Sequence, residues 1–220
     1  MSVAAIIPAY NEEYTVGVVI EALLSCPLID EIIVVSDGST DGTVQSAQRY
    51  PIKVVALEKN LGKGGAMKAG ANHTDCSILL FLDADLVGLQ RKHIEDLLYP
   101  VLSGQTEMSI GVFSEGRLFT DLALKITPSL SGQRAVKKEL FDAVPDLEDS
   151  RYGVETALTQ YAERQGVHIV KVPLPHMSHV TKEEKRGFVP GLQARLEMYK
   201  DIARSLRSEK KALDEECNSE

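Results

Sequence analysis

The chain has 220 residues, of which 44% are hydrophobic, so it can bury one sizeable core but has little room for a second independent domain. Its formal net charge of -8, from 24 basic and 32 acidic residues, argues against a nucleic-acid-binding surface spread over the molecule. The three cysteines are odd in number and far apart, which excludes a CxxC metal pair and a secreted disulfide framework and favours a reducing, cytoplasmic compartment.

Apolar runs in the sequence are short. The run at residues 78–82 is far below the roughly 20 residues that cross a bilayer. No basic segment precedes an apolar one at the start of the sequence, so no targeting signal is visible. We therefore expect no transmembrane anchor, and any contact with a membrane would be peripheral.

The first half of the sequence alternates short runs of β-branched residues with longer helix-like stretches. The predicted strands are residues 3–7, 32–35, 53–57 and 78–82. The predicted helices are residues 12–24, 42–50, 62–72 and 90–102. This alternation predicts the α/β class, with a mainly parallel, buried sheet flanked by helical crossovers.

The second half is less regular. The predicted elements are a strand at 107–113, an exposed connector at 116–130, a helix at 154–164, a strand at 168–172 and an amphipathic helix at 192–206. Residues 208–220 form a charged tail that we expect to fray. No internal repeat is visible, so the sequence predicts a single domain over residues 1–207.

Two carboxylates, Asp83 and Asp85, follow the fourth predicted strand directly. Open α/β sheets bind ligands at the carboxyl ends of their strands, which is where these side chains are placed. Two ionised carboxylates this close repel each other unless a cation neutralises them, and oxygen ligands favour Mg²⁺ or Mn²⁺. Such an ion would also hold the oxygens of a diphosphate. The alternative is a pair of solvated loop aspartates that cap the following helix.

The turn after the first predicted strand is also polar. Pro8 is expected to end that strand because it lacks a backbone donor, and Tyr10, Asn11 and Glu12 follow it. These side chains therefore lie at the same edge of the predicted sheet as the carboxylate pair. The alternative is an ordinary turn in which Asn11 caps the next helix.

A second polar turn follows the strand at residues 32–35. Asp37 in this turn is placed to accept hydrogen bonds from a base or a ribose. Ser39 or Asp41 is expected to cap the helix at residues 42–50.

A glycine-rich segment at residues 60–65, which contains Lys63, precedes a helix that begins near Ala66. Its backbone amides and its lysine are suited to face an anion at a helix N-terminus. The spacing of the glycines matches neither a P-loop nor the dinucleotide-binding GxGxxG pattern. A glycine cluster that only starts the helix is the alternative.

The four segments together are more specific than any one of them. They are PAYNEE at 8–13, SDGSTDGT at 36–43, NLGKGGAMKAG at 60–70 and FLDADL at 81–86. In this order and spacing they closely resemble the family 2 glycosyltransferases with the GT-A fold. The resemblance implies a metal-dependent enzyme that moves a sugar from a nucleotide diphosphate donor. It also divides the domain into a nucleotide-sugar-binding half, 1–105, and an acceptor-binding half, 106–207.

The resemblance also implies a role for each residue of these motifs. The nucleoside would be held by four residues: Pro8, Tyr10, Glu12 and Asp37. Lys63 would approach the base or the diphosphate, and Asp83 would face the ribose or the sugar. Asp85 would bind the metal ion and take part in catalysis.

Two segments of the second half resemble acceptor-binding parts of the same family. Residues 131–134, SGQR, resemble the acceptor loop that precedes a helix, in which Arg134 would clamp a phosphate or a carboxylate. Residues 152–155, YGVE, resemble a segment of dolichyl-phosphate mannosyltransferase-like and glucosyl-3-phosphoglycerate synthase-like enzymes, in which Glu155 would contact sugar or acceptor. The alternatives are a surface arginine and a structural glutamate, each at the start of a helix.

A histidine and a group of basic residues follow the last predicted strand. Of His176 and His179, the second is the better candidate for a third metal ligand of the kind that many GT-A enzymes use. Lys182, with Lys185 and Arg186, would close over the donor diphosphate. A solvated charged loop is the alternative.

The sequence does not fix the identity of the donor or of the acceptor. A UDP-sugar is favoured as donor, with GDP-mannose as the second option. A hydroxyl acceptor would benefit from a carboxylate base, for which Glu148 and Asp149 are candidates, whereas an ionised phosphate acceptor would not. The acceptor is therefore a small molecule or a lipid phosphate, the stereochemical outcome is open, and an oligomer is compatible with the sequence.

Three other functions compete with this interpretation. A polyprenyl-phosphate sugar transferase would act at the membrane surface. A sugar nucleotidyltransferase would need a basic, glycine-rich signature after the first strand, where this sequence has PAYNEE. A regulatory binding module would keep the nucleotide pocket without turnover.

Overall fold

The computed structural model of the chain describes residues 1–113, 131–145, 147 and 153–179. The chain divides into two compact units, Met1–His179 and Val180–Glu220, and every described residue belongs to the first. The predicted connector at 116–130, helix at 192–206 and tail at 208–220 lie outside the described residues. The domain limits predicted from the sequence therefore stay a prediction.

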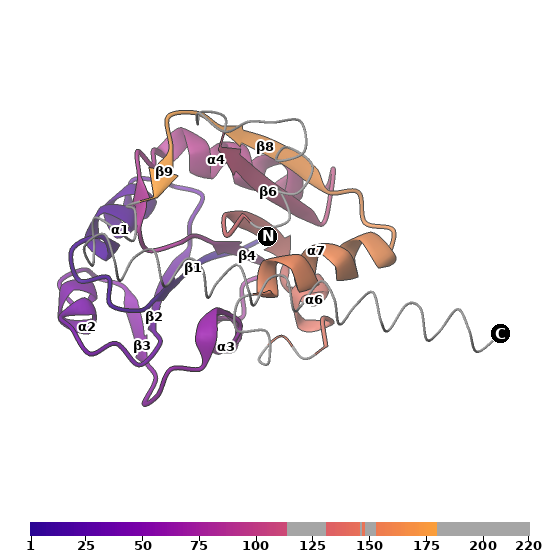
Figure 1. Cartoon of the computed structure of the whole chain (residues 1–220). Helices are drawn as coiled ribbons and strands as arrows, with labels where there is room; N and C mark the ends of the chain where they lie inside the picture. The colour runs from indigo at the N-terminus through magenta and orange to yellow at the C-terminus, as the bar shows by residue number, and fades with distance from the viewer. Residues whose placement is uncertain (114–130, 146, 148–152, 180–220) are drawn as a thin grey trace, which may run out of the picture. The chain divides into compact units, whose positions relative to one another are not determined.

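The main sheet has seven strands among the described residues, in the order β3-β2-β1-β4-β7-β6-β8 (Figure 1). Their bounds are β1 Val3–Ala9, β2 Glu31–Ser36, β3 Lys53–Ala56, β4 Ile78–Phe81, β6 Met108–Phe113, β7 Arg134–Lys137 and β8 Val170–Leu174. The first four strands in sequence pair in parallel, as predicted. β7 runs antiparallel between β4 and β6, and the sequence analysis did not predict this strand.

Helices cover both faces of this sheet (Figure 1). Helices α1 (Val16–Leu24), α2 (Thr43–Ala47) and α4 (Arg91–Leu102) pack in one hydrophobic core. Helices α3 (Gly62–Ala71), α6 (Lys138–Asp142) and α7 (Val154–Arg164) pack in the other. The α/β class and the layered arrangement predicted from the alternating pattern are confirmed.

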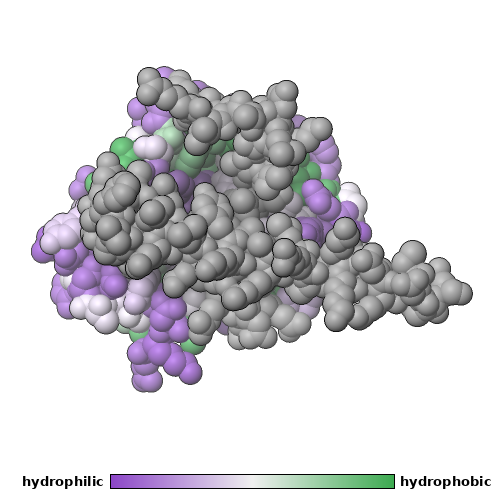
Figure 2. Space-filling model, viewed as in Figure 1, coloured by the Kyte–Doolittle hydropathy of each residue, from purple (hydrophilic) through white to green (hydrophobic). Residues whose placement is uncertain are grey.

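The central strands are hydrophobic along their whole length because both faces are buried. In β1, Val3, Ala5 and Ile7 lie in one core, whereas Ala4 and Ile6 lie in the other. Successive residues of a strand point to opposite faces, so a strand covered on both sides needs an unbroken apolar run. The surface around α2 and β3 is mainly hydrophilic in Figure 2, as expected when the apolar residues are inside.

The prediction that Pro8 ends the first strand is wrong. β1 continues to Ala9, and Pro8 is in register with Val35 of β2. The Ile6 carbonyl accepts from the Leu82 N–H on the β4 side, whereas the Ala9 carbonyl accepts from the Asp37 N–H on the β2 side. By this alternation the backbone of Pro8 faces β4. The pairing of β1 with β4 stops at Ile6 and Phe81. No strand is therefore paired opposite Pro8 on that side, and the N–H that proline lacks is not needed for a hydrogen bond of the sheet.

The first helix begins later than predicted. α1 begins at Val16 with Thr15 as its N-cap residue, so residues 12–15 are a turn rather than helix. Asn11 does not cap the helix: its φ of 57° is left-handed, and its side-chain oxygen accepts from the Thr40 N–H at 2.9 Å. Asn11 therefore joins the turns after β1 and β2.

The second helix is also shorter than predicted. α2 begins at Thr43, with Gly42 as the N-cap residue in place of Ser39 or Asp41. Asp41 still contributes, because its carboxylate accepts from the Thr43 N–H at 3.0 Å. Ser39 instead accepts from the Asn11 N–H at 3.1 Å.

A small second sheet lies beside the main one. It pairs β5 (Leu86–Val87) with β9 (Ser178–His179) in antiparallel register, with Leu86 opposite His179. Gly88 follows β5 with a φ of +79°, and a Cβ there would collide with the His176 carbonyl oxygen. Glycine is therefore required for the two segments to approach this closely.

None of the helices in the described part of the chain has the length and the apolar character needed to cross a membrane.

Candidate active site

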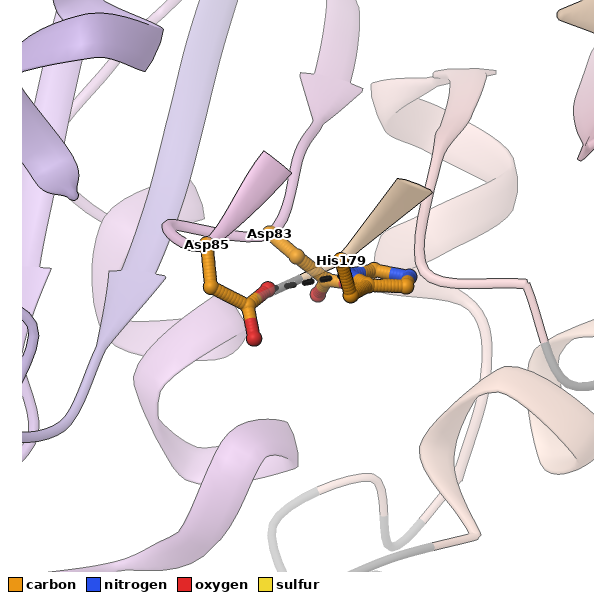
Figure 3. Close-up of side chains that lie close together, drawn as sticks. All are labelled: Asp83, Asp85 and His179. Carbon is orange, nitrogen blue, oxygen red and sulfur yellow. Dashed lines mark hydrogen bonds and ion pairs between the residues drawn. The ribbon is translucent and has the colours of Figure 1, made fainter. Parts of the chain in front are cut away.

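The carboxylate pair lies at the carboxyl edge of the parallel strands. Asp83 and Asp85 follow β4, which ends at Phe81, and the β5–β9 sheet brings His179 to the same place (Figure 3). One ligand atom from each of the three side chains lies within 4.8 Å of the other two. Three residues that the sequence analysis chose as metal ligands or donor contacts are thus brought together from two distant parts of the chain.

His179 contacts both aspartates. Its Nδ1 lies 2.9 Å from Asp85 Oδ1, and its Nε2 lies 3.9 Å from Asp83 Oδ2. Burial alone would lower the pKa of His179, but the hydrogen bond to Asp85 and the charge of Asp83 raise it above its usual value. The Phe113 ring at the end of β6 contacts the imidazole edge-to-face, with ring centroids 5.0 Å apart. Phe113 therefore limits how the imidazole can turn.

Lys63 joins the carboxylates of Asp83 and Glu155. Its Nζ forms an ion pair with Asp83 and a second with Glu155 Oε1 at 2.5 Å. Burial would lower the pKa of Lys63, but these two carboxylates raise it above its usual value. Burial would likewise raise the pKa of Asp83, but the charges of Lys63 and His179 hold it below its usual value. Lys63 and Asp83 are therefore both charged at neutral pH.

The cluster suits a divalent cation. Asp83, Asp85 and Glu155 carry three negative charges when ionised, against the two positive charges of Lys63 and the buried Arg134, so negative charge is in excess when His179 is neutral. Carboxylate oxygens with an imidazole nitrogen are a ligand set that fits Mg²⁺ or Mn²⁺. The helix-capping alternative does not account for the pair, because the N-cap residue of the following helix, α4, is Gln90.

Arg134 occupies a different place from the one predicted. It is the first residue of β7 rather than a residue at a helix start, and its side chain is fully buried. Its Nη1 donates to the Glu155 carbonyl at 3.0 Å and its Nη2 to the Ser131 carbonyl at 2.5 Å. Burial lowers the pKa of Arg134 to about 10. The alternative of a surface arginine is therefore excluded. The guanidinium donates to backbone carbonyls rather than to the anion that the predicted clamp would bind.

Asp37 caps the helix that carries Lys63. Its two carboxylate oxygens accept from the Leu61 N–H at 2.7 Å and the Gly62 N–H at 2.9 Å. Burial raises the pKa of this carboxyl above its usual value. Asp37 therefore fixes the glycine-rich segment against the end of β2, and a nucleoside would have to share this carboxylate with the helix.

The remaining donor candidates lie along the same edge. Pro8 lies near the end of β1, and Tyr10 is 42% exposed in the turn that follows. The Glu12 carboxylate accepts from the Thr15 hydroxyl at 2.7 Å, and the backbone N–H of Glu12 donates to the Thr43 hydroxyl at 2.8 Å. Lys182, Glu148 and Asp149 lie outside the described residues.

The comparisons with known proteins identify the family. The family model described as glycosyl transferase family 2 matches residues 4–147. The chain belongs to glycosyl transferase family 2. The resemblance stated from the four motifs is thereby confirmed.

Two curated proteins are similar to this chain over part of their length. Glucosyl-3-phosphoglycerate synthase of Mycobacterium tuberculosis is 29% identical over 195 residues, which are 71% of this chain and 59% of the synthase. Dodecaprenyl-phosphate galacturonate synthase of Rhizobium johnstonii is 33% identical over 96 residues, which are 39% of this chain and 28% of that enzyme. The chain thus spans less than two thirds of either relative.

A solved structure of the mycobacterial synthase has the same fold. It aligns with a TM-score of 0.76 at 28% identity and covers 94% of this chain and 79% of that chain. That structure is a complex with Mn²⁺, uridine diphosphate and glucosyl-3-phosphoglycerate. The predicted GT-A fold is therefore confirmed.

Three residues of this family 2 site were not predicted as site residues. Gln133 donates to Asp83, and Phe113 contacts His179. A Cβ at Gly132 would collide with the Asp83 carboxylate and would lie 2.5 Å from Lys63 Nζ. The sequence holds only a weak signal for them, because Gly132 and Gln133 lie beside Arg134 in a segment assigned to the acceptor as a whole.

Proposed function

We propose that this chain is a metal-dependent glycosyltransferase that moves a sugar from a UDP-sugar to a phosphorylated acceptor. The observation that carries the proposal is the cluster of Asp83, Asp85 and His179 at the carboxyl edge of a GT-A sheet. The related synthase binds Mn²⁺ and uridine diphosphate on the same fold, which supports the choice of donor and ion.

Asp85 and His179 would hold the ion, with Asp83 beside them. A bound Mg²⁺ or Mn²⁺ would supply charge stabilisation to the diphosphate that departs from the sugar. The ligand set of carboxylate and imidazole suits Mn²⁺ at least as well as Mg²⁺.

The other site residues orient the two substrates. Asp83 would accept a hydrogen bond from the ribose or the sugar, because Lys63 and Gln133 hold its carboxylate in one orientation. Glu155 would contact the sugar or the acceptor from the N-terminal turn of α7, where it is 7% exposed. Pro8, Tyr10, Glu12 and the segment fixed by Asp37 would form the nucleoside subsite. Arg134 would not contact the substrates; from its buried position it would hold the backbone of Glu155 and Ser131 in place through hydrogen bonds to their carbonyls.

An ionised phosphate acceptor simplifies the chemistry. Such an acceptor needs no general base to remove a proton, whereas a hydroxyl acceptor does. Glu155, ion-paired to Lys63 at 2.5 Å, is poorly suited as that base, because taking up a proton would weaken the pair. The related synthase is bound to glucosyl-3-phosphoglycerate, so we favour a phosphorylated small molecule as the acceptor; a hydroxyl of such a molecule would still have to lose its proton.

A second acceptor class has support of its own. The relative from Rhizobium johnstonii is a dodecaprenyl-phosphate galacturonate synthase, so a polyprenyl phosphate is the alternative acceptor. Both acceptors present a phosphate, and they differ in the lipid chain.

A product assay tests the proposal. The protein is incubated with Mn²⁺, UDP-glucose or GDP-mannose, and each of three acceptors: 3-phosphoglycerate, a short polyprenyl phosphate and unphosphorylated glycerate. We expect UDP release and a new sugar product with one of the two phosphorylated acceptors, and none with glycerate. Product with glycerate alone would contradict a phosphorylated acceptor, and formation of UTP from pyrophosphate and UDP-glucose would indicate a nucleotidyltransferase.

A further inference from the structure

Gln133 is a buried polar residue with two side-chain partners in the site. It is 1% exposed, and its Nε2 donates to Asp83 Oδ2 at 2.8 Å. Its Oε1 accepts from the Ser131 hydroxyl at 3.0 Å. Because the serine hydroxyl supplies a donor to the amide oxygen, the amide nitrogen is directed at the aspartate.

Asp83 is consequently held from two sides. Lys63 contacts Oδ1, and Gln133 contacts Oδ2. The lysine is shared with Glu155 and lies at the end of a long flexible side chain. The backbone of Gln133 is more firmly fixed, because its carbonyl accepts from the Gly111 N–H of β6 at 2.8 Å.

The next residue anchors the same segment on the other side. Successive residues of an extended chain point in opposite directions, so Gln133 faces Asp83 while Arg134 faces α7. The Arg134 guanidinium donates to the Glu155 and Ser131 carbonyls from a fully buried position. The segment that carries Gln133 is therefore tied to β6, to α7 and to its own Ser131.

We propose that Gln133 is a positioning residue that fixes the orientation of the Asp83 carboxylate for the donor nucleotide sugar. This inference rests on the proposed function. A carboxylate already held in its binding orientation has less rotational freedom to lose when the donor arrives, so donor affinity increases. Gln133 does not touch the reacting atoms and acts through Asp83.

Calorimetric titration of UDP in the presence of Mn²⁺ tests this role without turnover. Gln133→Met keeps an unbranched side chain of similar length but removes the donor, and we expect UDP to bind roughly 10-fold more weakly. Gln133→Glu places a like charge against Asp83, so its loss should be larger. Ser131→Ala frees the amide to turn, so its loss should be smaller.

Two further readouts separate positioning from general damage. With the full reaction, Gln133→Met should raise the donor KM more than it lowers kcat. Thr106→Val is the matched control, since Thr106 is also buried and hydrogen-bonded, donating to the His168 carbonyl, but lies away from the site. This control should lower the unfolding temperature by a similar amount while leaving UDP affinity unchanged.

The outcomes distinguish this role from the proposed function. If wild type binds UDP and folded Gln133→Met binds it equally well, the positioning role is wrong and the proposed function stands. If Gln133→Met does not fold, Ser131→Ala decides: unchanged UDP affinity and donor KM overturn the role. If wild type does not bind UDP with Mn²⁺, the proposed donor is wrong and the role of Gln133 falls with it.

Discussion

His179 Nδ1 lies 2.9 Å from Asp85 Oδ1, although the two residues are 94 positions apart in the sequence. The contact depends on the β5–β9 sheet, in which Leu86 is paired with His179. Because the two strands contribute only two residues each, the candidate metal site is held by a short sheet and by the close approach at Gly88. The cluster can form only after both segments have folded against each other.

Removing the imidazole should weaken metal binding. We expect His179→Ala to bind Mn²⁺ on the order of 10-fold more weakly or worse, since it deletes the single nitrogen ligand of the cluster. The fold should persist, because the His179 side chain is 39% exposed. Mn²⁺ titration followed by electron paramagnetic resonance measures the change. His168→Ala, an exposed histidine outside the cluster, is the control, and equal affinity in both variants would count against His179 as a ligand.

Removing the lysine between the carboxylates should destabilise the protein. Lys63→Met leaves Asp83 and Glu155, whose side chains are 19% and 10% exposed, without the cation that neutralises both. Loss of one partner of a buried ion pair costs about 3 kcal/mol, so urea unfolding should show a decrease of this order in the free energy of unfolding.

A matched lysine provides the control for this change. Lys68→Met removes an ion pair with Asp142, which retains a second partner in Lys138 at 3.3 Å. Its cost should stay below about 1 kcal/mol. Similar losses in the two variants would show that the Lys63 network is no stronger than a surface pair.

Substituting Asp37 by asparagine tests whether this residue only caps the helix or also contributes to ligand binding. Asp37→Asn keeps one acceptor but turns an N–H group toward the backbone donors of Leu61 and Gly62, so we expect a loss of about 1–2 kcal/mol in stability. We also expect weaker UDP binding, measured by calorimetry, because the Lys63 segment shifts. Asp30→Asn is the control, because the native Asp30 carboxylate also accepts from a backbone donor, the Val3 N–H of β1 at 2.8 Å, but is not among the residues of the candidate site. Unchanged UDP affinity in Asp37→Asn would restrict Asp37 to a structural role.

The α4 N-terminus should give a pH-dependent contribution to stability. His93 is 5% exposed, its Nδ1 accepts from the Gln90 N–H at 3.2 Å, and burial lowers its pKa below the usual 6.5. Between this lowered pKa and about 6.5 the unfolded chain binds the additional proton, so stability rises with pH and falls on acidification.

Substitution of His93 isolates this contribution. His93→Gln cannot titrate, so the difference in unfolding free energy between wild type and variant should shrink as the pH drops from 7 to 5. Denaturant titrations at several pH values measure it, and exposed His73→Gln should follow wild type. A difference that is constant with pH would contradict a buried, neutral His93.

The sequence predicted the elements whose burial is regular. The run at 78–82 corresponds to β4, and the helix at 154–164 matches α7 to the residue, because a strand or helix packed along its length has a clear apolar period. It missed β7, whose four residues Arg134–Lys137 begin and end with a basic residue and resemble a surface segment. It also missed β5 and β9, because strands of two residues have no period to detect.

The site was predicted to the extent that it lies at strand ends. Asp83 and Asp85 follow β4, and Lys63 lies in the first turn of α3, so the rule for ligand sites in open sheets placed them correctly at one edge. Arg134 was expected to clamp an anion from a loop, whereas it begins β7 and its two Nη atoms donate to the Glu155 and Ser131 carbonyls and the Thr159 hydroxyl, with its buried Nε left without a partner among the described residues. The contact of Gln133 with Asp83 depends on the antiparallel pairing of β7 with β4, which no local pattern in the sequence specifies.

The most direct test is a calorimetric titration of UDP into wild type and Asp85→Asn, each with Mn²⁺ and each with EDTA. Wild type should bind UDP with Mn²⁺ and lose most of that affinity in EDTA, and Asp85→Asn should bind weakly in both. Binding by wild type that is equally tight in EDTA, or Mn²⁺-dependent binding retained in Asp85→Asn, would contradict a metal site built on Asp85.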